Sequence, residues 1–234
     1  MVISGIQKFS ILDFPGKTAC IVFTPGCNFR CRFCYNPEFV LPEEIKKISD
    51  SFIPEDVFFN FLDQRKDLLD GVVITGGEPT VIADLPSFME RIKKKGFLVK
   101  LDSNGNKPEV LTDVFEKGLV DYIAMDIKTS LENYQDLSGE DAKPENIKKS
   151  IELIMKSGIP YEFRSTIVRE LHPEEVLKEM AKLIDGAKLY YMQAFRPGET
   201  LDPKVSDYHP YNKKEMKRIA NDIFKRHVEK VEVR

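Results

Sequence analysis

Short stretches of apolar residues, many of them β-branched or aromatic, recur along the chain with longer amphipathic stretches between them. Apolar runs of this length that are bounded by glycine, proline and polar residues are typical of buried strands. The pattern therefore predicts six strands, at residues 18–24, 71–75, 97–101, 120–126, 160–168 and 188–194.

The amphipathic stretches repeat their apolar residues with the spacing of an α-helix. Proline at the start of several stretches and glycine after the end of others are typical helix boundaries. This periodicity predicts helices at residues 54–67, 83–95, 108–117, 144–157, 173–185 and 211–228.

The alternation of strands and helices implies parallel strands that are joined by right-handed crossovers. Such units build either an open doubly wound sheet or a full or partial barrel, and six units are fewer than the eight of a closed barrel. In each architecture the chemistry gathers at the carboxyl ends of the strands. The residues that directly follow the predicted strands are therefore the first candidates for a functional site.

Composition narrows the possible partners. With 234 residues, 42% of them hydrophobic and 31% charged, the chain has an ordinary globular composition, and it contains no apolar run long enough to cross a bilayer. A formal net charge of -3 provides no overall field for attracting a nucleic-acid backbone. The first residues lack the features of a secretory signal, so we expect a cytoplasmic location in which thiols stay reduced.

Three of the four cysteines are clustered directly after the first predicted strand, in the segment TPGCNFRCRFCYNPE. Cys27, Cys31 and Cys34 have the spacing C-x3-C-x2-C, which allows three thiolates to converge on one metal centre and leaves a coordination position open. A structural zinc site and a disulfide are the alternatives. Structural zinc normally needs four protein ligands, and Cys20 falls within the predicted strand, so we favour a reactive iron–sulfur site.

Further polar motifs follow or end the later strands. Each has a plain structural alternative, namely a strand-to-helix turn, an Asn-Gly turn or a buried ion pair. Their position at successive strand ends favours a shared ligand site. The candidate residues at the strand ends are Gly76, Gly77, Glu78, Asp102, Ser103, Asn104, Asp126 and Lys128. Arg164 lies within the fifth predicted strand and joins them, because a buried arginine needs an anion or a satisfied polar network.

The cysteine motif, with the aromatic Phe33 before its last cysteine, resembles the signature of the radical S-adenosylmethionine (SAM) superfamily. The resemblance implies a 4Fe–4S cluster on Cys27, Cys31 and Cys34, whose remaining iron binds the amino and carboxylate groups of SAM. It also implies reductive cleavage of SAM to a 5′-deoxyadenosyl radical and methionine. In that family the backbone around the position of Phe33 contacts adenine.

The later motifs resemble those of the same family. Gly76-Gly77-Glu78 is similar to the motif that receives the methionine ammonium group, and the segments D-S-N-G and D-I-K resemble those of activating enzymes for glycyl radical enzymes, such as pyruvate formate-lyase activating enzyme. The resemblance implies a monovalent cation near Asp102 and Asp126, and Arg164 is a plausible partner of the methionine carboxylate. A histidine of those activators is missing here. Phe195 stands near its expected place, directly after the sixth strand, and the hydrogen bond of that histidine is either absent or supplied by Gln193.

Together with F-S-I-L-D-F-P-G-K near the start, the motifs most resemble anaerobic ribonucleoside-triphosphate reductase activating proteins. The implied reaction abstracts hydrogen from a glycine of a partner glycyl radical enzyme. Asp13 would then lie by the partner's glycine loop, although a turn-capping aspartate is an equal explanation. Residues 35–70 contain no cysteine, so we expect one cluster and an external electron donor such as flavodoxin or ferredoxin.

Two other functions stay open. One is a radical SAM enzyme with a small substrate, such as a 7-carboxy-7-deazaguanine synthase, and the other is a non-catalytic iron–sulfur or zinc protein. The short chain predicts an α/β fold of the partial (β/α)6 TIM-type barrel kind with parallel strands, open enough for a peptide loop. We expect a single domain over residues 1–234, with 1–17 as an N-terminal extension and turn, 18–200 as the (β/α)6 core and 201–234 as a C-terminal helix and tail.

Overall fold

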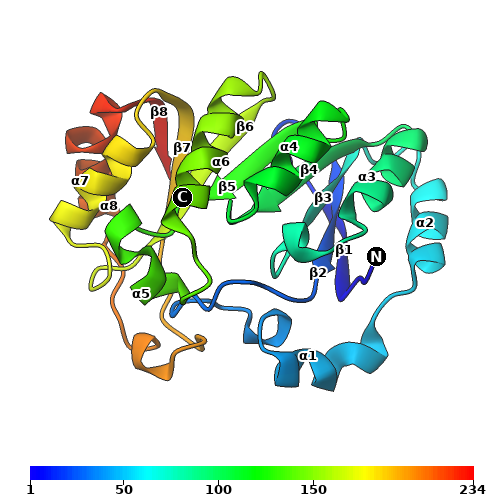
Figure 1. Ribbon diagram of the computed structural model, residues 1–234, viewed down its shortest axis with the longest axis horizontal. Coiled ribbons are helices and arrows are strands. Elements are labelled where there is room, and N and C mark those ends of the chain that lie inside the picture. The colour runs from blue at the N-terminus through cyan, green and yellow to red at the C-terminus, as the bar shows by residue number, and fades with distance from the viewer. The chain divides into compact units, whose positions relative to one another are not determined.

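The computed structural model describes residues 1–234 and shows an α/β fold (Figure 1). Its strands form one mostly parallel sheet in the order of the chain. They are β1 (Gly5–Ser10), β2 (Ala19–Thr24), β3 (Gly71–Gly76), β4 (Leu98–Ser103), β5 (Tyr122–Asp126), β6 (Tyr161–Ile167), β7 (Ala187–Ala194) and β8 (Val228–Val233).

The helices follow the strands as crossover connections and as shorter additions. They are α1 (Pro42–Ile48), α2 (Glu55–Asp63), α3 (Leu85–Lys94), α4 (Pro108–Glu116), α5 (Tyr134–Ser138), α6 (Pro144–Lys156), α7 (Glu174–Leu183) and α8 (Lys213–Asp222). By its internal contacts the chain divides into two compact units. Unit 1 contains residues 1–28, 36–103 and 109–123, and unit 2 contains residues 29–35, 104–108 and 124–234.

In unit 1, β1 pairs with β2 in an antiparallel manner, whereas β2, β3 and β4 are parallel neighbours. Alternation along the strands places Ile21 and Val73 on one face, where they join a buried cluster with Phe14 and Tyr122. The parallel register brings the carboxyl ends of β2, β3 and β4 to the same edge of the sheet. The first part of the cysteine loop, the Gly-Gly-Glu turn and the Asp-Ser motif therefore lie at this edge.

In unit 2, β6, β7 and β8 are parallel, and helices α6 and α7 precede β6 and β7 (Figure 1). Arg164 of β6 is in register with Tyr191 of β7, and Thr166 is in register with Gln193. Because side chains alternate along a strand, Arg164 and Gln193 belong to the same face of this part of the sheet.

The fold class is confirmed, and all six predicted strands form as β2 to β7. The six-strand count was too low, because β1 lies in the predicted extension 1–17 and β8 lies in the predicted tail 201–234. In β1 the side chains of residues 7 to 9 are exposed, so it lacks the apolar run that marks a buried strand. The last helix ends at Asp222 rather than at residue 228, and α1 and α5 were not predicted.

None of the helices has the length and the apolar character that a membrane crossing requires.

Candidate active site

In unit 1 the start of the cysteine loop is fixed by the Gly-Gly-Glu turn. The Gly77 N–H donates to the carbonyl oxygen of Thr24 at 2.8 Å, and the Glu78 N–H donates to that of Gly26 at 2.8 Å. The Gly26 N–H in turn donates to the Phe39 carbonyl oxygen at 2.8 Å. A side chain at position 77 would meet the Gly26 and Phe39 carbonyl groups inside van der Waals contact. Glycine is therefore required here by close backbone approach.

The Glu78 carboxylate, which is 1% exposed, joins this turn to the end of β4. Its Oε1 accepts hydrogen bonds from the Thr80 N–H at 3.1 Å, from the Thr80 hydroxyl, and from the Ser103 hydroxyl at 2.9 Å. A carboxylate that accepts several hydrogen bonds is held in one orientation. The predicted residues Glu78 and Ser103 are thus brought together, and this contact fixes the shape of the strand ends.

Asp102 and Asn104 have protein partners as well. The buried Asp102 accepts a hydrogen bond from the Lys100 ammonium at 2.6 Å. The Asn104 Oδ1 accepts from the Asn106 N–H at 3.0 Å, which is the local turn that the sequence offered as the alternative for this motif. Contacts of these residues with a ligand stay predictions.

In unit 2 the second part of the cysteine loop is held by two segments distant in sequence. The Arg30 N–H donates to the Ser138 carbonyl oxygen at 2.7 Å, and the buried Cys31 Sγ lies 3.4 Å from the Ser138 hydroxyl. On the other side, the Leu201 N–H donates to the Cys34 carbonyl oxygen at 2.9 Å. Sequence analysis missed Ser138 and Leu201, since neither lies in a recognisable motif.

All four cysteines are thiols rather than disulfides. Burial raises the pKa of the Cys31 thiol, and the nearby Lys128 charge opposes part of this effect. No group of three or more histidine, cysteine, aspartate or glutamate side chains is close enough to hold a metal ion. The convergence of the three thiols thus stays a prediction, supported by a donor set of three soft sulfurs on one short loop. That donor set fits an iron–sulfur cluster.

An ion triad at the end of β5 and the middle of β6 brings together three of the predicted residues. The Asp126 carboxylate pairs with the Lys128 ammonium at 3.0 Å and with the Arg164 guanidinium, and all three side chains are partly buried. Burial opposes ionisation of Asp126, but the charges of Arg164 and Lys128 outweigh it and hold the pKa of Asp126 well below its usual range. Two cations share this carboxylate, and cationic side chains held in this way suit an anionic ligand group.

Phe33 and Phe195 both belong to a buried apolar cluster in unit 2, together with Leu137, Val168 and Val205. Phe195 is 1% exposed and its ring stacks on Tyr35 at 5.7 Å. These side chains therefore pack in the core of unit 2, and a contact of either with a ligand stays a prediction. Gln193, on the same face as Arg164, is half-buried and remains the candidate replacement for the missing histidine.

His172 is a further buried residue that the sequence did not single out. Its Nδ1 accepts from the Val168 N–H at 2.9 Å, and its Nε2 lies 2.8 Å from the Lys128 carbonyl oxygen. Its ring also meets Phe33 edge-on at 6.2 Å. His172 therefore ties the end of β5, the end of β6 and the cysteine loop together.

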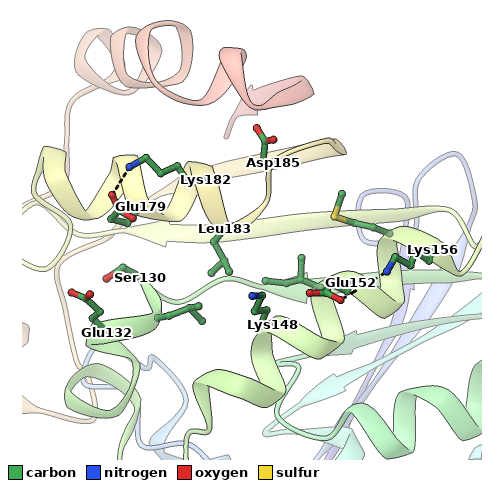
Figure 2. Close-up of a pocket in the computed structure, with 12 residues that line it drawn as sticks. Ser130, Glu132, Lys148, Glu152, Lys156, Glu179, Lys182, Leu183 and Asp185 are labelled. Atoms are coloured by element: carbon green, nitrogen blue, oxygen red, sulfur yellow. Dashed lines mark hydrogen bonds and ion pairs between the residues drawn. The ribbon is translucent and has the colours of Figure 1, made fainter.

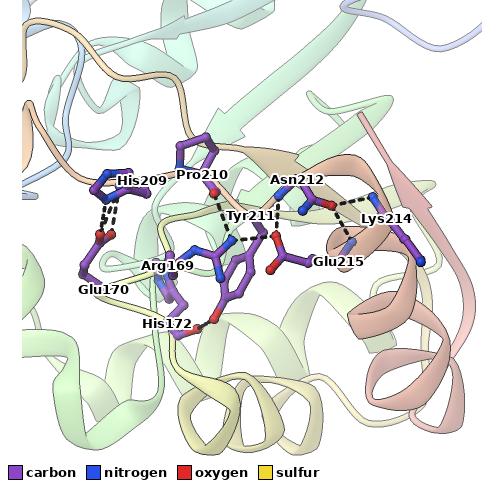
Figure 3. Close-up of polar contacts among 9 residues, drawn as sticks. All are labelled: Arg169, Glu170, His172, His209, Pro210, Tyr211, Asn212, Lys214 and Glu215. Atoms are coloured by element: carbon purple, nitrogen blue, oxygen red, sulfur yellow. Dashed lines mark hydrogen bonds and ion pairs between the residues drawn. The ribbon is translucent and has the colours of Figure 1, made fainter.

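The loop that carries His172 is anchored to the segment before α8 (Figure 3). The Tyr211 hydroxyl donates to the His172 carbonyl oxygen at 2.9 Å, and the Arg169 guanidinium pairs with Glu215 at 2.6 Å. Asn212 and Glu215 form a capping box at the start of α8. The C-terminal segment thus supports the strand ends of unit 2.

A surface groove of about 670 Å³ also lies in unit 2, between α6 and α7 (Figure 2). Its lining combines charged residues such as Lys148, Glu152 and Lys182 with a few apolar side chains. None of the predicted site residues lines it, so we do not assign the chemistry to this groove.

The position of Asp13 differs from that of the other predicted residues. Ser10 pairs with Ala19 at the first residue of β2, so the turn with Asp13 lies at the amino-terminal edge of the parallel strands, at the opposite end of β2 from Cys27. The Asp13 carboxylate accepts a hydrogen bond from the Ser10 hydroxyl, and that hydroxyl in turn accepts from the Leu12 and Asp13 N–H groups of the turn. Its contact with a partner protein stays a prediction.

Similar proteins identify the family of this chain. A model of the radical SAM superfamily matches residues 21–187. The chain is 33% identical over 239 residues to a Methanocaldococcus jannaschii protein that is named as a candidate glycyl-radical enzyme activating enzyme, covering 100% of this chain and 95% of that protein. It is 26% identical over 210 residues to the 7-carboxy-7-deazaguanine synthase of Thermococcus kodakarensis, covering 83% of this chain and 81% of that enzyme.

Among solved structures, Streptococcus suis SuiB has a TM-score of 0.63 at 16% identity, with 92% of this chain and 49% of SuiB covered. This likeness concerns the fold alone. Because the family model spans most of the chain and a relative matches it over its full length, the chain is a radical SAM enzyme, of the branch that resembles the activating enzymes of glycyl radical enzymes.

Proposed function

We propose that this radical SAM enzyme installs a glycyl radical on a partner enzyme of the anaerobic ribonucleotide reductase or pyruvate formate-lyase type. The observation that carries the proposal is the relative in Methanocaldococcus jannaschii, which matches the chain from end to end and is named as a candidate activating enzyme. The Asp-Phe-Pro-Gly turn and the D-S-N-G and D-I-K motifs point to the same branch.

The cofactors implied by the family are one 4Fe–4S cluster and SAM, and Cys27, Cys31 and Cys34 would hold the cluster. When bound, the pair supplies a 5′-deoxyadenosyl radical by reductive cleavage of SAM. With no other clustered cysteines in the chain, the electron comes from an external donor such as flavodoxin or ferredoxin.

The residues of the chain then have distinct tasks in binding SAM. The cationic side chains of Lys128 and Arg164, which Asp126 holds in place, attract the methionine carboxylate. The backbone at Gly76 and Gly77 receives the methionine ammonium group, while the hydrogen bonds of Glu78 keep that backbone in place. Burial of these groups excludes water and strengthens their electrostatic effect.

The hairpin of β1 and β2 supports a protein substrate. Phe9, Ile11 and Leu12 next to Asp13 are 55%, 64% and 78% exposed. Adjacent exposed apolar side chains commonly mark a surface that another protein covers. Because this turn lies at the opposite end of β2 from Cys27, we assign it to a contact with the partner enzyme outside its glycine loop, with Asp13 as the polar member of that contact.

The test is electron paramagnetic resonance spectroscopy of a cognate glycyl radical enzyme. After incubation with the reconstituted protein, SAM and a reductant under anaerobic conditions, the partner should show a protein-based glycyl radical. A partner with its glycine changed to alanine is the control and should show none.

A small-molecule reaction is the second candidate, because the 7-carboxy-7-deazaguanine synthase of Thermococcus kodakarensis also matches most of the chain. If no candidate partner shows a glycyl radical signal while a purine or pterin analogue stimulates formation of 5′-deoxyadenosine, this second function replaces the first.

A further inference from the structure

A lysine ammonium is buried next to Asp102 in unit 1. Lys100 is 1% exposed, and its Nζ lies 2.6 Å from Asp102 Oδ1 and 5.9 Å from the ring centroid of Tyr122. Lys100 is in register with Val73, so it belongs to the sheet face of the apolar cluster that contains Val73 and Tyr122. Asp102, two residues further along β4, is on the same face. A positive charge is therefore built into the core of the unit beside this carboxylate.

Resemblance to the activating enzymes implies a monovalent cation near Asp102 and Asp126, and the structure tests whether these residues fit one. Asp102 is paired with Lys100, and Asp126 is paired with both Lys128 and Arg164. A hard cation binds where carboxylate oxygens still offer negative charge, and an adjacent ammonium repels it. Both carboxylates already have protein cations as partners, so they do not fit a monovalent cation site.

We propose that the Lys100 ammonium takes the place of this cation, so that Asp102 and the end of β4 keep their arrangement without Na⁺ or K⁺. Lys100 is then a positioning residue that acts through Asp102. The inference rests on the proposed function, because it assumes that SAM binds at the end of β4.

The first experiment measures the dissociation constant of SAM by isothermal titration calorimetry on the reconstituted wild-type protein. Solutions of sodium, potassium and tetramethylammonium chloride at equal ionic strength are compared. The three constants should agree within about twofold, whereas a loss of about tenfold or more in tetramethylammonium would overturn the inference. Absence of SAM binding in every salt, with an intact cluster, would contradict the proposed function instead.

The second experiment uses Lys100→Met, which keeps an unbranched side chain and removes the charge. This variant should bind SAM more weakly than wild type in tetramethylammonium, by about tenfold or more, and sodium or potassium should restore the affinity in a saturable manner. The same affinity in all salts for a folded Lys100→Met protein would refute the role of Lys100. Because the wild-type comparison needs no variant, it can still overturn the inference if Lys100→Met does not fold.

The matched control is Lys93→Met. The Lys93 ammonium also pairs with an aspartate in unit 1, at 2.7 Å from Asp121, but it is partly exposed and lies on α3. This variant should show no dependence on the cation. If sodium instead raises the SAM affinity of Lys93→Met as much as that of Lys100→Met, the salt acts generally and the inference is overturned.

Discussion

A methyl group added at Gly77 should displace the start of the cysteine loop. An ideal Cβ at this position would lie 2.7 Å from the Gly26 carbonyl carbon and 2.8 Å from the Phe39 carbonyl oxygen, and closer still to the Gly26 oxygen. All of these atoms are backbone, so no side-chain rotation relieves the clash. The backbone at Gly77 does not have a positive φ, and the effect of Gly77→Ala is therefore steric.

The loss in the free energy of unfolding can be estimated from the contacts that Gly77→Ala must disturb. The Glu78 N–H bond to Gly26 and the Gly26 N–H bond to Phe39 are both 2.8 Å long, and each contributes about 1 kcal/mol net. Overpacking of a tight interior adds about 1–3 kcal/mol. The free energy of unfolding should fall by about 4 kcal/mol in total, which for a chain of this size lowers the melting temperature by roughly 8–16 °C.

The assay compares thermal unfolding of the apo protein with the iron content after anaerobic reconstitution. Gly77→Ala should melt lower and retain little iron, since Cys27 directly follows the displaced loop residue. Gly5→Ala is the control, because a Cβ there meets the Phe23 side chain at an ordinary 3.6 Å. If Gly77→Ala has the same melting temperature as Gly5→Ala and binds as much iron, the proposed packing of the turn against the loop is wrong.

Three further variants test other parts of the site. Cys20→Ala should keep about four irons per chain, because Cys20 is buried in β2 and burial raises its pKa to about 12. Cys31→Ala should lose the cluster. Iron analysis that gives the reverse would contradict the ligand assignment. Asp126→Asn should lower the free energy of unfolding by about 1–3 kcal/mol and weaken SAM binding, because it removes the carboxylate that Lys128 and Arg164 share. Denaturant unfolding checks this, and an unchanged midpoint would refute it. Burial lowers the pKa of His172 below the value of about 6.5 that it has in the unfolded chain, so the unfolded state binds more protons and wild-type stability should fall as the pH drops below about 6.5. The free energy of unfolding of His172→Asn, measured between about pH 7.5 and 5.5, should lack this component, and parallel curves for the two proteins would show that His172 does not titrate in this way.

Much of the fold was predictable because buried parallel strands are marked by continuous apolar runs. The strands at the two edges of the sheet were missed for the opposite reason. The exposed residues of β1 resemble a loop, and the alternating Val-Glu-Lys-Val-Glu-Val of β8 follows directly on a helical pattern. An edge strand buries one face at most, and only its pairing with a neighbour reveals it.

The candidate site was also predictable only in part. The motifs were predictable because each lies within a few residues of a strand end. The contacts that hold them were not, since Ser138 meets Cys31 across 107 positions of sequence and Ser103 meets Glu78 across 25. The role of Lys100 was equally hidden, because only the burial of β4 shows that its ammonium has Asp102 as a partner rather than water.

Transfer of a deuterium atom from the partner to the product tests the central claim most directly. A cognate glycyl radical enzyme is prepared with both Cα hydrogens of its glycines replaced by deuterium. It is incubated anaerobically with the reconstituted protein, SAM and a reductant. Mass spectrometry should find one deuterium in the 5′-deoxyadenosine, and none when the radical-bearing glycine of the partner is replaced by alanine. If 5′-deoxyadenosine forms in the presence of the labelled partner but carries no deuterium, the hydrogen comes from elsewhere and glycyl radical installation is not the function of this enzyme.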